Sequence, residues 1–273
     1  MSTRIASHGR LINRAKALSF TFNGKVMSGF EGDTLAASLL ANDQMLMGRS
    51  FKYHRPRGVL ASGGEEPNAL INLGVESGFE PNARATTTET FAGLTAASQN
   101  HFPSLEFDVG AINSKLSRFL PAGFYYKMFI HPRSFWKHIY EPIIRHSAGL
   151  GKAPKARDQD SYEHYYHHCE VMVVGGGIAG LQAARSAAAT GVRVLLVEQT
   201  ANWGGRAPVD GVLIEGMEAE RWVVQTLKAL AAADNVVIRN RTQGSGVYDH
   251  GYALAYERIA DHTPGDGRPR HRL

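Results

Sequence analysis

Three glycines in the second half of the chain have the spacing of a phosphate-binding turn. Gly175, Gly177 and Gly180 form the pattern G-x-G-x-x-G. In such a turn the first glycine allows a tight reversal, the second lets the backbone approach a pyrophosphate, and the third lets a helix pack closely on a strand. The helix that follows adds free N–H groups and a partial positive charge at its N-terminus. We therefore predict that Gly175, Gly177, Ile178, Ala179 and Gly180 bind a dinucleotide.

The segments around this turn have the order strand, turn, helix, strand. Residues 170–174 form a short β-branched run that predicts a buried strand, and the alanine-rich residues 181–190 predict a helix. Gly191 ends that helix, and residues 192–197 predict a second buried strand. Glu198 closes this strand about 20 residues after the turn, where an acid can accept a hydrogen bond from a ribose hydroxyl. An acid there disfavours a 2′-phosphate, so NAD or FAD fits better than NADP. A glycine-rich turn without a ligand is the alternative.

A second glycine pair, Gly204-Gly205, follows Glu198 and is itself followed by Arg206. This extension resembles the two-dinucleotide-binding flavoproteins, in which such a pair continues along the nucleotide. The first site of most of those proteins holds FAD, so the motif by itself favours FAD.

Composition indicates an ordinary soluble globular protein of two domains. Of the 273 residues 43% are hydrophobic and 20% are charged, and the formal net charge is +5. Such a mild excess of basic residues does not require a nucleic-acid partner. The chain has one cysteine and no apolar run long enough to span a membrane. The basic N-terminus lacks an apolar signal core, so we expect a cytoplasmic protein, with a mitochondrial presequence as the alternative.

The first hundred residues predict a small domain that opens with a hairpin and a helix. Residues 18–22 alternate apolar and polar side chains, Asn23-Gly24 supplies a hairpin turn, and residues 25–30 return. Asp33 or Thr34 can cap a helix that starts at Leu35. This order is the opening of a ferredoxin-like, ubiquitin-roll fold. We expect a further strand around residues 86–88.

The loop after this helix lacks the ligands of an iron–sulfur cluster. In plant-type ferredoxins a loop here carries Cys-x₄-Cys-x₂-Cys for a [2Fe–2S] centre. The same spacing falls on Ala61, Glu66 and Ala69. Because alanine cannot ligate iron, we predict the scaffold of a cluster domain without a cluster.

A basic loop with interleaved aromatic residues precedes that segment. It admits three interpretations: a contact to a cofactor phosphate or a partner, a nucleic-acid contact, or a structural loop paired with acids such as Glu65 and Glu66. We expect no nucleic-acid partner, and we propose Arg55 or Arg57 for a flavin phosphate or an acidic partner surface. The residues concerned are Arg49, Phe51, Lys52, Tyr53, His54, Arg55 and Arg57.

The middle of the chain is rich in aromatic residues and then becomes a linker. Eight aromatics lie between residues 119 and 140, with Pro121, Gly123 and Pro132 interrupting any long helix. A subunit interface, an intradomain core and an interfacial membrane segment are the alternatives; we expect an interface and no membrane contact. Residues 149–162 are polar, with Gly and Pro. The run His164, His167, His168 and Cys169 contains metal-ligand types, but its spacing matches no closed site, and we expect no metal.

The rest of the chain predicts the continuation of a Rossmann-like domain. Residues 216–233 have helical apolar spacing, residues 236–238 suggest a third parallel strand, and residues 243–248 and 251–258 suggest an antiparallel hairpin. No return strand follows, so we expect an incomplete dinucleotide domain that is inactive in isolation. The expected organisation is a flexible N-terminus at 1–12, a ferredoxin-like domain at 13–100, a connecting segment and linker at 101–162, and the dinucleotide domain at 163–273.

Three stretches together resemble one protein family. GRSFKYHRPRG with EEPNAL, PAGFYYKMFIHPRSFWKHIYEPIIR, and HCEVMVVGGGIAGLQAA are similar to the alpha subunits of heterotetrameric sarcosine oxidases. The resemblance covers the chain from about residue 9 and implies the N-terminal portion of a subunit roughly three times longer. The implied fold combines α/β and α+β: a ferredoxin-like domain without cluster cysteines, then the first part of a two-dinucleotide-binding flavoprotein domain.

The resemblance also implies a function within a complex. Such complexes demethylate sarcosine to glycine with oxygen, releasing hydrogen peroxide, and the one-carbon unit leaves as formaldehyde or on tetrahydrofolate. NAD is implied for the site of this chain, lined by Gly175, Gly177, Gly180, Glu198, Gly205 and Arg206, and FAD stays the alternative. FAD and FMN are implied on or near a beta subunit, with gamma and delta subunits as further partners and a folate site beyond residue 273. No residue here matches a catalytic base. A related N-methylglutamate or secondary-amine dehydrogenase and a non-catalytic assembly module remain alternatives.

Overall fold

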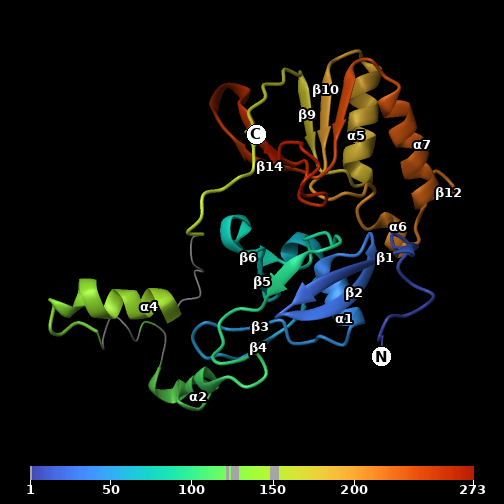
Figure 1. Ribbon diagram of the computed structural model, residues 1–273. Helices are drawn as coiled ribbons and strands as arrows, with labels where there is room; N and C mark the ends of the chain where they lie inside the picture. The colour runs from blue at the N-terminus through green and yellow to red at the C-terminus, as the bar shows by residue number, and fades with distance from the viewer. Residues whose placement is uncertain (1, 121–122, 124–128, 148–153) are drawn as a thin grey trace. The chain divides into compact units, whose positions relative to one another are not determined.

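The computed structural model describes residues 2–120, 123, 129–147 and 154–273 (Figure 1). The chain divides into two compact units, Met1–Gln159 and Asp160–Leu273. Each unit has its own cluster of buried hydrophobic side chains. Both parts of the predicted fold class are confirmed: a ferredoxin-like unit is followed by a Rossmann-like unit.

The first unit is built on a five-stranded sheet with the order β2-β1-β7-β5-β6. Strands β1 (Asn13–Phe22) and β2 (Lys25–Glu31) form the predicted antiparallel hairpin. Asn23 and Gly24 in its turn have φ of 50° and 75°, as a type I′ turn requires. Strand β7 (Thr95–Ala97) runs parallel to β1 and antiparallel to β5 (Leu70–Leu73), which pairs with β6 (Glu80–Arg84).

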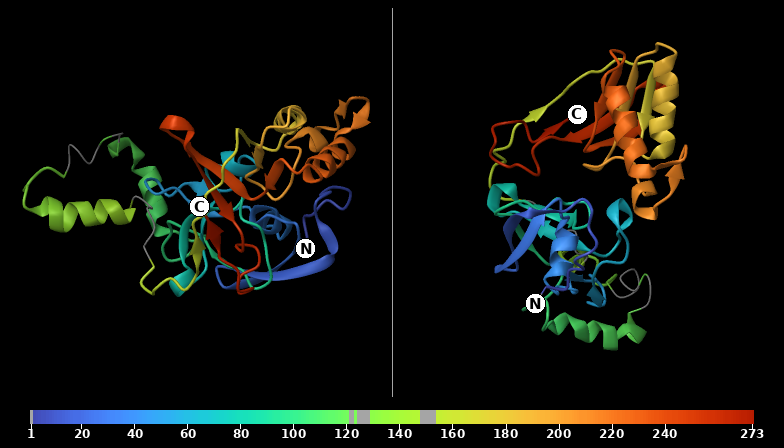
Figure 2. Two further views of the ribbon diagram at one scale, coloured as in Figure 1. Left: turned by 90° about the horizontal axis from the view of Figure 1, so that it is seen from above. Right: turned by 90° about the vertical axis from the view of Figure 1, so that its right-hand side faces the viewer.

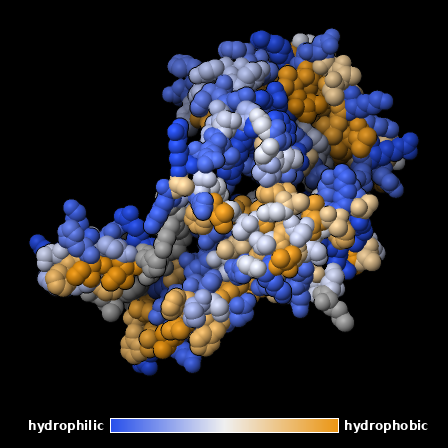
Figure 3. All heavy atoms as spheres, viewed as in Figure 1, coloured by the Kyte–Doolittle hydropathy of each residue, from blue (hydrophilic) through white to orange (hydrophobic). Residues whose placement is uncertain are grey.

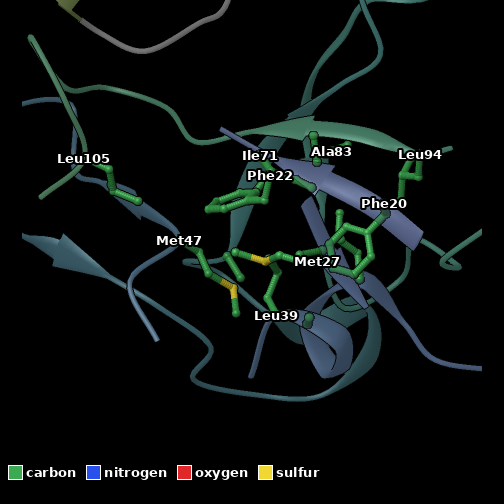
Figure 4. Close-up of a cluster of buried hydrophobic side chains, with 14 residues drawn as sticks. Phe20, Phe22, Met27, Leu39, Met47, Ile71, Ala83, Leu94 and Leu105 are labelled. Atoms are coloured by element: carbon green, nitrogen blue, oxygen red, sulfur yellow. The ribbon is translucent and has the colours of Figure 1, made fainter. Parts of the chain in front are cut away.

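Helix α1 (Leu35–Ala41) covers this sheet and starts at the predicted cap. The Thr34 hydroxyl accepts a hydrogen bond from the N–H of Ala37 at 3.2 Å. Leu35 and Leu39 are fully buried in one cluster with Phe20 and Phe22 of β1. Figure 4 shows Leu39 in this cluster. This core fixes the helix and the sheet as one body.

The N-terminal segment, for which we predicted flexibility, makes contacts with the rest of the first unit. The Arg4 guanidinium donates two hydrogen bonds to the carboxylate of Asp33, at 2.8 and 2.6 Å. The N–H of Thr3 donates to the carbonyl of Ala41. A buried ion pair therefore ties this segment to the start of helix α1.

Residues 86–88 do not form the strand that we expected. The chain turns there, after β6, and the hydroxyls of Thr87 and Thr88 both donate to the carbonyl of Arg84. Threonine side chains that bond to nearby backbone carbonyls compete with a strand ladder. Local hydrogen bonding therefore outweighed β propensity.

Short elements connect and extend the first unit. They are β3 (Gly48–Arg49), β4 (Pro56–Arg57), η1 (Gly63–Glu65), η2 (Glu76–Gly78), η3 (Val109–Ala111), α2 (Ile112–Lys115), η4 (Ser117–Phe119), the π-helix η5 (Trp136–Tyr140) and α4 (Glu141–Ser147). Among the predicted aromatics, Phe124, Tyr125 and Tyr126 lie outside the described residues.

The second unit contains the predicted strand–helix–strand arrangement. Strands β9 (Val171–Val174), β10 (Val194–Val197) and β13 (Val236–Arg239) form a parallel sheet in the order β13-β10-β9. Helices α5 (Ile178–Ala189) and α7 (Ala219–Ala231) are the crossover connections and lie on one face of this sheet (Figure 2). Their buried side chains close a core between sheet and helices.

An antiparallel hairpin lies on the side of the sheet away from the helices (Figure 2). Strands β14 (Thr242–Val247) and β15 (Ala253–Arg258) form the predicted pair, joined by η6 (Asp249–Gly251). Strands β16 (His271–Arg272) and β8 (Tyr162–Glu163) complete a four-stranded sheet.

The helix predicted over residues 216–233 starts three residues late. Glu215 and Gly216, with φ of 53° and 76°, make a turn between β11 (Leu213–Ile214) and β12 (Met217–Glu218). A residue pair in the left-handed region suits a hairpin and not a helix start. A candidate membrane-spanning helix is absent from the parts of the chain that the structure describes.

Candidate dinucleotide site

The three motif glycines between β9 and α5 are each glycine for a different physical reason. Gly175 has φ of +107°, a conformation that side chains rarely adopt. A Cβ on Gly180 would lie 1.9 Å from the carbonyl oxygen of Gly175, so helix and turn are in direct backbone contact there. A Cβ on Gly177 would meet nothing within 4 Å. The turn is therefore closed behind Gly180 and open in front of Gly177, as pyrophosphate approach requires.

The N-terminus of helix α5 begins at this opening. Gly177 is its cap residue and offers no side chain, and the N–H of Leu181 donates to the carbonyl of Gly177. The N–H groups of Ile178, Ala179 and Gly180 precede the first intrahelical donor, so they have no acceptor within the helix. The helix starts three residues earlier than we predicted, because Gly180 belongs to its first turn.

Glu198 at the end of β10 is buried and bonded to the turn. One carboxylate oxygen accepts from the N–H of Gly176 at 2.6 Å. The other accepts from the N–H and the hydroxyl of Thr200, at 2.8 and 2.9 Å. The acid therefore holds the glycine turn against the second strand, besides standing where a ribose hydroxyl would be recognised. Sequence reasoning found Glu198 but missed its bond to Gly176.

The second glycine pair packs directly on the first glycine motif. The N–H of Gly204 donates to the carbonyl of Gly176 at 2.7 Å, and Gly204 forms a parallel bridge with Gly177. A Cβ on Gly205 would lie 3.3 Å from the Cα of Gly177. The structure thus brings together the two glycine segments, 27 positions apart (204 minus 177), that the sequence placed in one site.

Trp203 is a residue of this site that sequence reasoning missed. A Cβ on Gly176 would lie 2.3 Å from the Cε3 atom of the Trp203 ring and 3.0 Å from the Cβ of Glu198. The indole therefore needs a glycine at position 176. The run of three consecutive glycines at 175–177, where the motif asks for two, is the signal that could have revealed a bulky neighbour.

Arg206 lies at the outer edge of this arrangement. Its side chain is 88% exposed and pairs with Asp210 at 3.1 Å, across the first turn of helix α6 (Ala207–Asp210). Arg206 therefore follows the glycine pair in the chain, and its positive charge is exposed at the edge of the site.

Taken together, these residues fit a dinucleotide. The open face of Gly177 leaves room for a pyrophosphate, and the N-terminus of α5 supplies donors and a favourable dipole there. Glu198 lies at the end of the adjacent strand, with a carboxylate that a 2′-phosphate would meet as a like charge.

The cluster-type loop of the first unit does not fit an iron–sulfur group. The three cysteine positions hold Ala61, Glu66 and Ala69, and the one cysteine of the chain, Cys169, belongs to the second unit. Burial raises the pKa of the Cys169 thiol. A set of two methyl groups and a carboxylate cannot replace thiolate ligands.

The basic loop has a largely structural role in the case of Arg49. Its guanidinium donates to the carbonyls of His54, Leu105 and Glu106, and lies 3.8 Å from the carboxylate of Asp108. We named Glu65 and Glu66 as acids for this loop. The acid that His54 contacts is Asp108, whose carboxylate lies 2.7 Å from the Nδ1 of His54. Burial opposes ionisation of Asp108, but bonds from the N–H of Phe102 and from His54 prevail and lower its pKa.

The two cations at the tip of this loop flank one aromatic ring. Lys52 and the guanidinium of Arg55 each lie 4.8 Å from the ring centroid of Tyr53. The Tyr53 hydroxyl donates to the carbonyl of Leu120 at 2.7 Å. The ring therefore holds two positive charges close together on the surface.

Large apolar side chains are exposed along the segment after the sheet of the first unit. They include Phe102, Phe107, Ile112, Phe119, Phe135, Trp136 and Ile143. Figure 3 shows hydrophobic residues on the surface over α2 and α4. Basic residues accompany them, among them Lys115, Arg118 and Lys137. We call this set the aromatic surface.

The histidine-rich lead-in to β9 forms no metal-type cluster. Within the described ranges, no three His, Cys, Asp or Glu side chains converge as ligands. Burial lowers the pKa of the His167 imidazole.

Comparison with known proteins defines first the class and then the family. Residues 15–101 match the family described as a 2Fe-2S iron-sulfur cluster binding domain, and residues 170–253 match the FAD dependent oxidoreductase family. The crystal structure of L-proline dehydrogenase from P. horikoshii superposes with a TM-score of 0.54 at 20% identity, over 90% of this chain and 38% of that chain, which shows a shared fold. The chain thus has the class of a protein with a ferredoxin-like unit ahead of a unit of the FAD dependent oxidoreductase type.

Curated relatives identify the family. The chain is 48% identical to the sarcosine oxidase subunit alpha of Rhizobium meliloti over all of its length and 28% of that protein. It is 33% identical to the corresponding subunit of Corynebacterium sp. strain U-96, over 94% of the chain and 22% of that protein. The chain belongs to the sarcosine oxidase alpha subunit family, as the sequence resemblance implied. It spans about a quarter of the length of these relatives.

Proposed function

We propose that the second unit of this chain binds NAD as part of a sarcosine-oxidase-type complex. The observation that carries the proposal is the open face of Gly177 at the N-terminus of α5, with Glu198 bonded to the same turn. The proposed lining residues are Gly175, Gly177, Ile178, Ala179, Gly180, Glu198, Gly204, Gly205 and Arg206.

The role of these residues is binding and orientation. The backbone donors of the α5 first turn would hold the pyrophosphate, and the Glu198 carboxylate would accept from a ribose hydroxyl while keeping the turn in place. NAD supplies a hydride acceptor when bound, but we assign no hydride step to the residues of this chain. No catalytic base is proposed within residues 1–273.

The proposed reaction belongs to the whole complex. Sarcosine would be oxidised to glycine with formation of hydrogen peroxide, and the methyl carbon would leave as formaldehyde or methylene-tetrahydrofolate. We place the amine substrate on a partner subunit, FAD and FMN on or near it, and tetrahydrofolate on chain beyond residue 273. Beta, gamma and delta subunits are the proposed partners, in the cytoplasm, with no nucleic acid and no membrane.

The first unit and the connecting segment are proposed to dock those partners. We divide the chain into a ferredoxin-like domain at 13–100, a connecting segment at 101–162 and the dinucleotide domain at 163–273. The aromatic surface supports this role, because aromatic side chains with basic neighbours are typical of protein interfaces. Replacing Phe135 and Trp136 by serine should reduce co-purification of the other subunits. Replacing Val247, which is 80% exposed in the second unit, by serine should leave co-purification unchanged.

FAD is the alternative cofactor and has support of its own. The FAD dependent oxidoreductase family matches residues 170–253, and Gly204-Gly205 packs on the first glycine motif. The deciding experiment is to purify the chain with its co-expressed partner subunits, denature it, and identify the released nucleotide by mass. One NAD per chain beside the flavins of the partner subunit supports the proposal. A second FAD per chain, without NAD, replaces NAD by a redox flavin, and no nucleotide beyond the partner's flavins refutes a cofactor role for this chain.

The amine substrate is tested on the same preparation. Turnover of sarcosine, N-methylglutamate and proline is compared at equal protein concentration. A preference for N-methylglutamate would reassign the complex to a related secondary-amine dehydrogenase, and loss of assembly without loss of turnover in site variants would favour an assembly module.

A further inference from the structure

The loop of residues 60–69 gathers four backbone N–H groups on one point. These donors belong to Leu60, Ala61, Asn68 and Ala69. Backbone N–H groups that converge in this way form an anion-binding nest, the arrangement used for phosphates and iron–sulfur groups. The loop therefore presents four converging donors although it has no thiolates.

The point on which the donors converge is held by the carboxylate of Glu66. One of its oxygens accepts from Leu60 and Ala61, each at 2.6 Å. The other accepts from Asn68 at 2.6 Å and from Ala69 at 3.1 Å. Glu66 itself is fully buried, the bond to Ala69 is buried with it, and the bonds to Leu60, Ala61 and Asn68 are partly buried.

The rest of the loop is built around this carboxylate. The Nε of Arg84 donates to the backbone carbonyl of Glu66 at 2.8 Å, and the hydroxyl of Thr86 donates to the carbonyl of Gly63 at 2.6 Å. Ala69, at the third position of the Cys-x₄-Cys-x₂-Cys spacing, is buried in the hydrophobic core. Strand β6 and the turn after it therefore hold the loop in the conformation that surrounds the Glu66 carboxylate.

We propose that Glu66 is the resident anion of this loop: its carboxylate takes the place of an anionic iron–sulfur group, so that the domain folds around its own side chain without iron. The residue stands at the second cysteine position of the Cys-x₄-Cys-x₂-Cys spacing, the position from which a side chain reaches the centre of the loop. A negative charge satisfies the four donors, which an alanine at the same position would leave without an acceptor.

The ionisation of Glu66 agrees with this role. Burial by itself would raise the pKa of the carboxyl, but the hydrogen bonds from the four backbone N–H groups outweigh it and lower the pKa below its ordinary value. The anion is therefore the form that the folded loop holds at neutral pH.

The test uses chemical rescue of Glu66→Ala in the 273-residue chain. Removal of the Glu66 carboxylate should lower the melting temperature by about 5 °C or more, because the backbone donors lose their acceptor. Sodium formate supplies a free carboxylate that fits the vacated space. Compared with sodium chloride at equal ionic strength, formate should recover at least half of the loss in Glu66→Ala. Glu65→Ala, an exposed neighbour in the same loop, is the matched control and should respond equally to both salts.

Two results would overturn the proposal. One is a Glu66→Ala chain that melts within about 2 °C of Glu65→Ala, a shift too small for lost buried hydrogen bonds. The other is a destabilised Glu66→Ala chain that formate stabilises no more than chloride does.

A second variant keeps the test decisive should Glu66→Ala fail to fold. Glu66→Gln keeps the shape of the side chain but turns one oxygen into an amide donor that faces two N–H groups. Amide hydrogen exchange should then accelerate in one donor pair, at residues 60 and 61 or at residues 68 and 69. Unchanged exchange in both pairs, relative to Glu65→Ala, would refute the assignment.

Discussion

Two single-methyl substitutions in the glycine turn should separate folding from cofactor binding. Gly180→Ala places a Cβ 1.9 Å from the carbonyl oxygen of Gly175, about 1.5 Å closer than the 3.4 Å at which ordinary contact begins. Gly177→Ala places the same methyl group where nothing lies within 4 Å. The two changes are chemically identical and three residues apart.

The expected magnitudes differ in kind. In a helix, alanine is favoured over glycine by about 1 kcal/mol. At position 180 this gain is overcome because α5 must move off the turn, and overpacking of this type costs about 1–3 kcal/mol. At position 177 the backbone has φ of −70° and ψ of 178°, which alanine adopts freely. We therefore expect a net loss of up to about 2 kcal/mol and a lower melting temperature for Gly180→Ala, and an unchanged melting temperature for Gly177→Ala.

Nucleotide binding should be weakened by Gly177→Ala, the variant whose melting temperature is unchanged. The methyl group of Gly177→Ala occupies the side from which a pyrophosphate would approach, and a clash of about 1.4–2.8 kcal/mol weakens affinity about tenfold to a hundredfold. The assays are a thermal melt of both variants and the NAD retained per chain, counted apart from the partner's flavins, after co-purification with the partner subunits. A Gly177→Ala chain that folds and retains nucleotide at the wild-type level would refute the site, and a Gly180→Ala chain as stable as wild type would refute the packing argument.

Two further predictions concern buried charges in the first unit. Arg4→Met should destabilise the chain by about 3–5 kcal/mol in urea unfolding, because it leaves the fully buried Asp33 carboxylate without its cation. Lys16→Met, which breaks the exposed pair with Glu31, should have a much smaller effect, because water screens an exposed ion pair; equal effects would contradict the N-terminal anchor. Asp108→Asn should be less stable than wild type at pH 7. Since the pKa of Asp108 is lowered in the folded state, its contribution is present above the unfolded pKa of about 4 and is lost as pH falls further. The two unfolding curves should therefore converge in acid, and a gap that is constant with pH would exclude the ionised carboxylate as the cause.

Local patterns predicted the elements that local chemistry determines. The Asn23-Gly24 turn, the Thr34 cap and the strand–helix–strand order around Gly175 all follow from residues close together in the sequence. The helix starts were displaced at Gly180 and at Gly216, because a glycine alone does not say whether it opens a helix or a turn.

Long-range contacts were not visible in those patterns. The Arg4 pair with Asp33 joins segments 29 positions apart, and nothing local marks the two residues as partners. Glu66 was seen as a missing cysteine, and only the loop geometry reveals that it satisfies four donors. Trp203 was hidden because its role depends on the fold returning to Gly176.

Strand β9 has a consequence for handling the chain in solution. Within the described residues it pairs with β10 alone, so its outer edge carries backbone groups without a strand partner, and Val174 at its end is 59% exposed. An open edge of a parallel sheet is a template on which another strand can add. When the chain is prepared by itself, this edge can recruit the same edge of a second molecule, and light scattering should then rise with protein concentration. Met172→Pro, which removes one backbone donor from this four-residue edge strand, should then weaken the concentration dependence.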